Sequence, residues 1–152
     1  MELRMTVPEL RAFLAEVFPQ LAGRFDIRAL EPYRAEVAMI AAETDLRPGG
    51  TVSGPAMFTL ADCAFYIATL AMIGPVPLAV TTNCAIDFLR KPAPGPLLAE
   101  ARILKLGRSL AVGDVFLTSE GVAGPVARAS LTYSIPPDAR PSPARTHSTT
   151  SS

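Results

Sequence analysis

The chain has only one histidine, His147, and it lies near the C-terminus in a polar stretch that cannot bury a core. A Ser-His-Asp or Cys-His catalytic arrangement needs a histidine base inside the fold, as does a histidine-containing zinc or di-iron site. The phosphate-binding patterns GxxxxGK[ST] and GxGxxG are also absent. A carboxylate, hydroxyls and backbone amides remain for chemistry, and we expect neither a metal nor another cofactor.

Charged residues are few as well, at 18% of the chain, and the formal net charge is zero. This balance excludes the basic surface that a nucleic-acid-binding domain needs. Cys63 and Cys84 lie in apolar runs without disulfide or metal-ligand spacing, and the N-terminus lacks an apolar signal core. We therefore expect a cytoplasmic protein without a nucleic-acid partner.

The densest apolar run is residues 54–73, GPAMFTLADCAFYIATLAMI, which contains one acid, Asp62, and no base. A helix that is apolar all round is buried either in a protein or in a membrane. A bilayer span would place Asp62 near its middle, at a cost of roughly 2.5–3.5 kcal/mol, and no Lys or Arg occurs between Arg47 and Arg90 to anchor the ends. We expect a core helix with Asp62 as the catalytic group. The alternative is an acid held by hydroxyls for structural reasons alone.

The segment before this run predicts a helix and a hairpin. Thr6 and Glu9 are spaced as a helix N-cap and its capping-box partner, and the apolar spacing that follows predicts a helix ending near Gly23. Alternating residues then predict strands at 25–30 and 33–42, followed by a loop at 44–52.

The segment after the apolar run predicts four strands, at 79–89, 97–106, 110–118 and 126–135. On the first of them we expect one face to carry Val80, Thr82, Cys84, Ile86 and Phe88. Residues 1–135 should thus form one α+β domain, with a curved antiparallel sheet wrapped around the apolar helix and a second copy covering what the sheet leaves open. Residues 136–152, PPDARPSPARTHSTTSS, are expected to be disordered.

Gly54 stands where the loop becomes the apolar helix. The first amides of a helix have no partner within it, and because Pro55 carries no N–H, the amide of Gly54 is the natural donor to a substrate carbonyl. Plain helix capping by Ser53 or Gly54 is the alternative. Asp62 lies eight residues further on, about 12 Å along the helix. One reacting carbonyl can meet both groups only if they come from different copies, which predicts an obligate oligomer.

The stretch from Gly49 to Ala64, GGTVSGPAMFTLADCA, resembles the hotdog-fold thioesterases of the phenylacetate-pathway type. The motif of that family reads roughly N-x-x-G-x-x-H-G-G, six residues and then Asp, usually within L-A-D-x-A. Gly50, Gly54 and Leu60-Ala61-Asp62 match it in place. The segments TTNCAIDFLRKPAPG, LKLGRS and GPVARASLTYSI also look like strands of that family, so the resemblance covers about residues 24 to 135.

The resemblance implies a hotdog fold, dimers with a continuous sheet and often tetramers built as dimers of dimers. It implies hydrolysis of acyl-coenzyme A (CoA) thioesters to free acid and CoA, without a metal. By position, Asp62 would be the general base or nucleophile, the Gly54 N–H would polarise the thioester carbonyl, and Thr81 would help to hold the attacking water.

Three departures from the motif bear on the activity. Ser53 stands where the motif has histidine, Pro55 replaces its second glycine, and Arg47 falls where its asparagine would be. Ser53 can hydrogen-bond a thioester but does not titrate near neutrality. Pro55 has no N–H, so a possible hydrogen-bond donor to the oxyanion is missing at this position. Removing such a donor costs about 2.7–4 kcal/mol of transition-state stabilisation in known cases. A non-catalytic acyl-CoA-binding protein is therefore an alternative. A hotdog hydratase or dehydratase is less favoured, because those enzymes generally rely on a histidine in the site.

The phosphates of CoA need cations, and Lys91, Lys105 and Arg108 are candidates, with Gly107 and Ser109 in the turn after residues 97–106. Arg47 and Pro55, at the entry to the apolar helix, are also assigned to substrate binding. Exposed Lys and Arg at strand ends are more often simply solvated.

Overall fold

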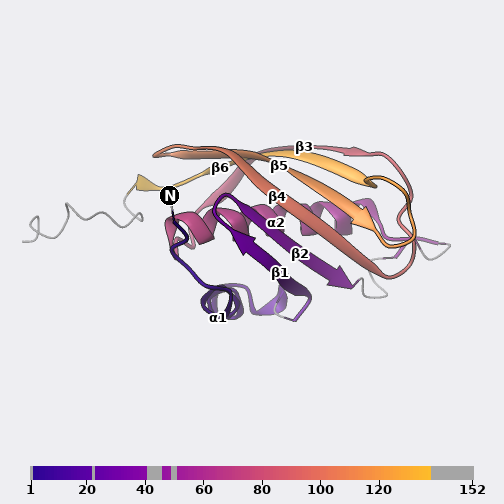
Figure 1. The fold of residues 1–152 in the computed structure, drawn as a ribbon, viewed down its shortest axis with the longest axis horizontal. Coiled ribbons are helices and arrows are strands. Elements are labelled where there is room, and N and C mark those ends of the chain that lie inside the picture. Colours follow the sequence, from indigo (N-terminus) through magenta and orange to yellow (C-terminus); the bar gives the residue numbers. More distant parts are fainter. Residues whose placement is uncertain (1, 22, 41–45, 49–50, 138–152) are drawn as a thin grey trace, which may run out of the picture.

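The computed structural model describes residues 2–21, 23–40, 46–48 and 51–137. A long helix, α2, lies against a curved antiparallel sheet, and a short helix, α1, lies on the side of α2 away from β4, β5 and β6 (Figure 1). The elements in chain order are α1 (Val7–Val17), a short 3-10 turn (Pro19–Leu21), β1 (Phe25–Glu31), β2 (Arg34–Ile40), α2 (Gly54–Ile73), β3 (Val80–Phe88), β4 (Pro96–Leu106), β5 (Leu110–Ser119) and β6 (Ala127–Ser134).

The six strands follow the order β1-β2-β4-β5-β6-β3, and every neighbouring pair is antiparallel. Strands β1 and β3 are the two edges. A single central helix wrapped by such a sheet is the hotdog fold, so the predicted α+β class and architecture are confirmed.

Helix α2 begins and ends where the sequence predicts. Ser53 is its N-cap and accepts a hydrogen bond from the Ala56 amide, and Gly74 ends it with a φ of 95° that favours glycine. From Cys63 to Ile73 every residue is buried. The helix is long and apolar enough to cross a membrane, but 83% of its most apolar window is buried inside the protein. The sheet and α1 therefore supply the apolar surroundings that this helix needs.

The predicted start of α1 is confirmed and its predicted end is wrong. Thr6 and Glu9 form the expected capping box, but the helix ends at Val17 with Phe18 as its C-cap, not near Gly23. Pro19 explains the early end, because the residue before a proline is sterically disfavoured in the helical conformation. Residues 41–45, in the predicted second strand and loop, and the predicted tail from 138 onward, which includes His147, lie outside the described residues.

The predicted face of β3 holds from Cys84 onward, where Cys84 and Ile86 pack against the core, but it is wrong for Val80 and Thr82. The register of β3 against β6 shifts between Thr81 and Asn83, which leaves Thr82 as an extra residue. Such a bulge changes which side chains share a face. Thr81 and Cys84 are half-buried, whereas Val80, Thr82 and Phe88 are exposed. The bulge therefore turns Thr81, and not Thr82, toward the interior.

Gly113 on β5 sets how closely α2 packs on the sheet. A Cβ atom at this position would collide with the carbonyl oxygen of Arg102 on the neighbouring strand and with the ring of Phe65, a fully buried residue of α2. Neither the backbone nor a buried ring can move away cheaply.

We expect Gly113→Ala to destabilise the fold by about 1–3 kcal/mol or more through overpacking. Urea unfolding monitored by circular dichroism measures this. Gly107→Ala is the matched control, since its Cβ would meet only the Leu110 carbonyl oxygen at an ordinary 3.5 Å. Equal destabilisation by the two substitutions would contradict this account of the packing.

Candidate functional site

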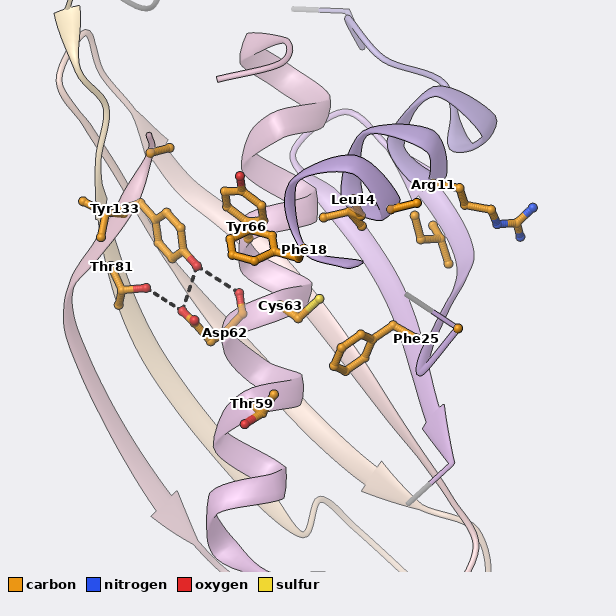
Figure 2. A pocket seen from close by; sticks show the side chains of 15 residues that line it. Arg11, Leu14, Phe18, Phe25, Thr59, Asp62, Cys63, Tyr66, Thr81 and Tyr133 are labelled. Carbon is orange, nitrogen blue, oxygen red and sulfur yellow. Dashed lines mark hydrogen bonds between the residues drawn. The ribbon is translucent and has the colours of Figure 1, made fainter. Parts of the chain in front are cut away.

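Asp62 lies on α2 at the meeting point of two hydroxyl groups. The Thr81 hydroxyl donates a hydrogen bond to Oδ1 of Asp62 at 2.6 Å, and the Tyr133 hydroxyl lies 2.7 Å from the same oxygen and 3.1 Å from the Asp62 carbonyl oxygen (Figure 2). This is the geometry expected if hydroxyl groups hold the acid for structural reasons alone. The same geometry also prepares the carboxylate for chemistry.

The two hydroxyls leave the second carboxylate oxygen open. Within the described ranges, no hydrogen bond reaches Oδ2 of Asp62. A carboxylate oxygen accepts hydrogen bonds from donors, a proton from water, or a bond to an electrophilic carbon. Because both donors bind Oδ1, Oδ2 is the oxygen that keeps its capacity to accept.

From the sequence, Tyr133 was not identified as a site residue. Tyr133 is 3% exposed and packs between the rings of Phe65 and Tyr66, with centroids 5.4 and 6.0 Å away. Burial, reinforced by the charge of Asp62, raises its pKa further above the ordinary value, so the phenol stays a proton donor. The signal in the sequence was the tyrosine itself, since a buried tyrosine hydroxyl usually has a hydrogen-bond partner.

Asp62 forms part of the wall of a cavity of about 470 Å³, in which apolar and aromatic side chains dominate. Figure 2 shows Thr81 and Tyr133 on one side of Asp62, and Phe18, Phe25 and Leu14 on the other. The lining residues come from α1, α2, β1, β3, β6 and the segments next to them: Arg11, Leu14, Ala15, Phe18, Gly23, Phe25, Ile27, Thr59, Asp62, Cys63, Tyr66, Ala79, Val80, Thr81 and Tyr133.

Cys63 also lines this cavity, next to Asp62 in the chain. Burial, reinforced by the charge of Asp62, raises the pKa of the Cys63 thiol to about 12. The reactive form of cysteine is the thiolate, which this environment suppresses near neutrality. Asp62 is therefore the better candidate for the reacting group.

The start of α2 is arranged as the sequence suggests. The Ser53 side chain accepts from the Ala56 amide at 3.3 Å, so the capping alternative holds for Ser53. Pro55 has no N–H, and the Met57 amide donates to the Ser53 carbonyl. In the described part of the chain nothing accepts a hydrogen bond from the Gly54 amide, which is left for a ligand. A Cβ at Gly54 would lie 3.3 Å from the Phe88 ring, which places Phe88 directly beside this helix end.

Gly54 and Asp62 share one straight helix and are not brought together within the chain. Their separation of eight residues corresponds to about 12 Å. Their neighbours on the sheet also lie at opposite ends of β3. Thr81, which holds Asp62, pairs with Tyr133 near the start of β3, whereas Phe88, beside Gly54, is the last residue of that strand.

The candidate CoA-binding residues divide between the two ends of the sheet. Lys105, Gly107, Arg108 and Ser109 lie at the β4–β5 hairpin, next to the row of Leu110, Ser134 and Val80. Lys91 follows the other end of β3, and Arg47, whose amide donates to the Thr51 carbonyl, lies in the segment leading into α2. The strands between these ends span on the order of 20 Å. Within one chain, therefore, the two groups cannot hold the same phosphate.

Among the residues that the structure describes, no group of three or more His, Cys, Asp or Glu side chains is placed to hold a metal ion.

Comparison with known proteins gives a consistent picture. The model of the thioesterase superfamily matches residues 49–125. No curated protein matches the chain.

Solved structures match much more of the chain. A candidate thioesterase from Silicibacter sp. TM1040 is 55% identical, with a TM-score of 0.83 over 90% of this chain and 96% of that one. A variant of the phenylacetic acid degradation protein PaaI from Thermus thermophilus is 30% identical, with a TM-score of 0.67 over 78% and 99% of the two chains. A Streptococcus mutans UA159 protein, smu.793, bound to acetyl-CoA, is 26% identical, with a TM-score of 0.66 over 74% and 88%.

We expect Tyr133→Phe to destabilise the protein by about 1.5–3 kcal/mol at pH 7, because it removes a hydrogen bond to a charged group. Tyr66→Phe is the matched control, since the Tyr66 hydroxyl makes only a 3.4 Å contact with the Pro77 carbonyl. Urea unfolding of both variants measures the difference. If Tyr133→Phe costs no more than Tyr66→Phe, the phenol does not support the carboxylate.

Proposed function

The chain belongs to the thioesterase superfamily, and on that premise we propose that it hydrolyses acyl-CoA thioesters with the Asp62 carboxylate as general base or nucleophile. Thioester hydrolysis is the chemistry of the family. The CoA ester and the residue roles are the proposed part. The observation that supports them is a carboxylate in the wall of an apolar cavity, with one oxygen held by two hydroxyls and the other accepting no hydrogen bond from the described residues.

The hydroxyls of Thr81 and Tyr133 fix the carboxylate so that Oδ2 points to the reacting group. In one route, Oδ2 takes a proton from water while the water oxygen bonds to the thioester carbon. In the other, Oδ2 itself bonds to that carbon, and water later hydrolyses the anhydride. In both, the carbon–sulfur bond breaks, the sulfur leaves with the electron pair and CoA takes up a proton. The roles of Thr81 and Tyr133 are the same in either route.

The negative charge that develops on the carbonyl oxygen needs a donor, and the Gly54 amide at the start of α2 is the proposed one. Because Gly54 and Asp62 of one chain are about 12 Å apart, the donor would come from Gly54 of the partner subunit. The edge strand β3 favours such pairing, since Val80 and Phe88 are 55% and 52% exposed on it. Antiparallel pairing of two β3 edges brings opposite ends of the strands together. It thereby brings the Asp62 end of one copy to the Gly54 end of the other.

The same pairing would bring the Lys and Arg side chains from the two ends of the sheet to a single CoA molecule. The hairpin residues Lys105, Gly107, Arg108 and Ser109 of one copy would meet the partner's Lys91 and Arg47 beside the CoA phosphates. Ser53 and Pro55 would flank the thioester. The relative with acetyl-CoA bound supports a CoA ester as the ligand. Dimer or dimer of dimers, absence of a metal and cytoplasmic location remain predictions from the sequence.

A non-catalytic acyl-CoA-binding protein is the second candidate, and one observation favours it. Ser53 stands at the histidine position of the motif, and its oxygen already accepts the Ala56 amide. Its hydroxyl proton can still be donated, but a serine does not titrate near neutrality as a histidine does. Such a protein would bind CoA esters and release no thiol.

We expect Asp62→Asn to lower thiol release from acyl-CoA by a factor of about 10²–10⁴, the usual contribution of a general base. Release is measured with a thiol reagent across a panel of acyl-CoAs, and circular dichroism checks the fold. Asp87→Asn is the matched control, because Asp87 is an exposed carboxylate paired with Arg128 at 3.0 Å. Unchanged turnover in Asp62→Asn would remove Asp62 from the mechanism. A wild type that binds the esters without turnover would establish the second candidate.

The shared site predicts complementation between two inactive variants. Gly54→Pro removes the N–H at the first helical position, where proline is tolerated, and Gly54→Ala adds a Cβ but keeps the N–H as a control. A mixed dimer of Gly54→Pro and Asp62→Asn would contain one intact site and recover about half of the wild-type activity of a two-fold dimer. Differently tagged, co-expressed chains allow its purification. Mixed dimers as inactive as either parent would show that both groups act within one chain.

A further inference from the structure

About half of the cavity wall comes from the N-terminal part of the chain. Leu14, Ala15 and Phe18 of α1 and its C-terminal end line it, as do Phe25 and Ile27 of β1. The thioesterase superfamily model matches only residues 49–125, so these wall residues lie outside it. Asp62 thus lies within the family match, and the N-terminal wall lies outside it.

This N-terminal wall offers a ligand almost nothing but carbon. The Phe18 ring meets the Tyr66 ring edge-on, with centroids 5.7 Å apart, and Phe25 lies beside Cys63 (Figure 2). Arg11 is the one cation of the lining, and its guanidinium pairs with Asp26 at 3.3 Å and points away from Asp62. A surface of this kind stabilises apolar groups in proportion to the area they bury.

Helix α1 is anchored independently of the residues that line the cavity. Leu10 is fully buried, Thr6 and Glu9 cap the helix, and the Arg4 amide donates to the Ala71 carbonyl at 2.6 Å. Ala15 is exposed to solvent and also lines the cavity, so it lies at the open edge of the cavity. The wall can therefore be altered at Ala15 without removing what holds the helix in place.

We propose that α1 and β1 form an acyl-selecting wall that makes this chain prefer apolar acyl groups long enough to reach Leu14 and Phe18. The inference rests on the proposed function, because it assigns the acyl group of the same thioester. A cavity of about 470 Å³ is in the range of small-molecule pockets, about 300–1,000 Å³. An acetyl group leaves most of it empty, whereas a decanoyl chain contacts the wall.

The test compares acetyl-, hexanoyl- and decanoyl-CoA in the wild type and in Ala15→Phe, whose added ring narrows the cavity at its open edge. In the wild type we expect kcat/KM to rise about threefold to fourfold per methylene until the cavity is filled. Ala15→Phe should lower the ratio of kcat/KM for decanoyl-CoA to kcat/KM for acetyl-CoA by at least about tenfold, the effect of two buried methylenes. Ala12→Phe is the matched control, since Ala12 is exposed on the same helix and does not line the cavity.

A binding arm separates failure of this inference from failure of the proposed function. Affinities of the same esters, and of free CoA, are measured by calorimetry in Asp62→Asn with and without Ala15→Phe. If the wild type turns nothing over but affinity rises with chain length and Ala15→Phe removes the rise, hydrolysis fails and the acyl-selecting wall stands. A response that is flat with chain length in both arms, or equal effects of Ala15→Phe and Ala12→Phe, would overturn the acyl-selecting wall.

Discussion

The two hydrogen bonds from Thr81 and Tyr133 to one oxygen of Asp62 are the interaction on which the rest of the site depends. An ionised carboxylate on an apolar helix needs donors, because burial without them is costly. Thr81 reaches the carboxylate because of the bulge in β3, and Tyr133 reaches it from β6 because Phe65 and Tyr66 hold its ring. The packing of the sheet on α2 is therefore directly coupled to the orientation of the reacting group.

The same arrangement explains how one chain can be well packed and yet hold only part of the proposed site. The sheet and α1 surround most of α2, and they bring the carboxylate, its donors and an apolar cavity together. The helix amide that completes the proposed chemistry lies at the far end of the same rigid helix, beside Phe88. The half-exposed apolar residues of β3, Val80 and Phe88, lie at these two ends, on the edge that a second copy would use.

Local patterns in the sequence predicted much of the fold and part of the site. The cap of α1, both ends of α2 and the alternation of β4 and β6 follow from neighbouring residues, and Asp62 is conspicuous in an apolar run. The features that were missed depend on distant contacts or on a single backbone irregularity. Tyr133 is 71 residues from Asp62, and the bulge that selects Thr81 over Thr82 leaves no sign in a regular alternation. Pro19 is the local signal for the end of α1, and the predicted end near Gly23 did not use it.

A crystal structure of the Asp62→Asn variant with decanoyl-CoA bound tests the central claim most directly. The account predicts the thioester carbon within about 3–3.5 Å of the side chain at position 62, on the side away from Thr81 and Tyr133. The carbonyl oxygen should face the Gly54 amide of a second copy, and the chain should extend toward Phe18. A thioester bound elsewhere, with the side chain at position 62 in contact only with its two hydroxyls, would contradict the account.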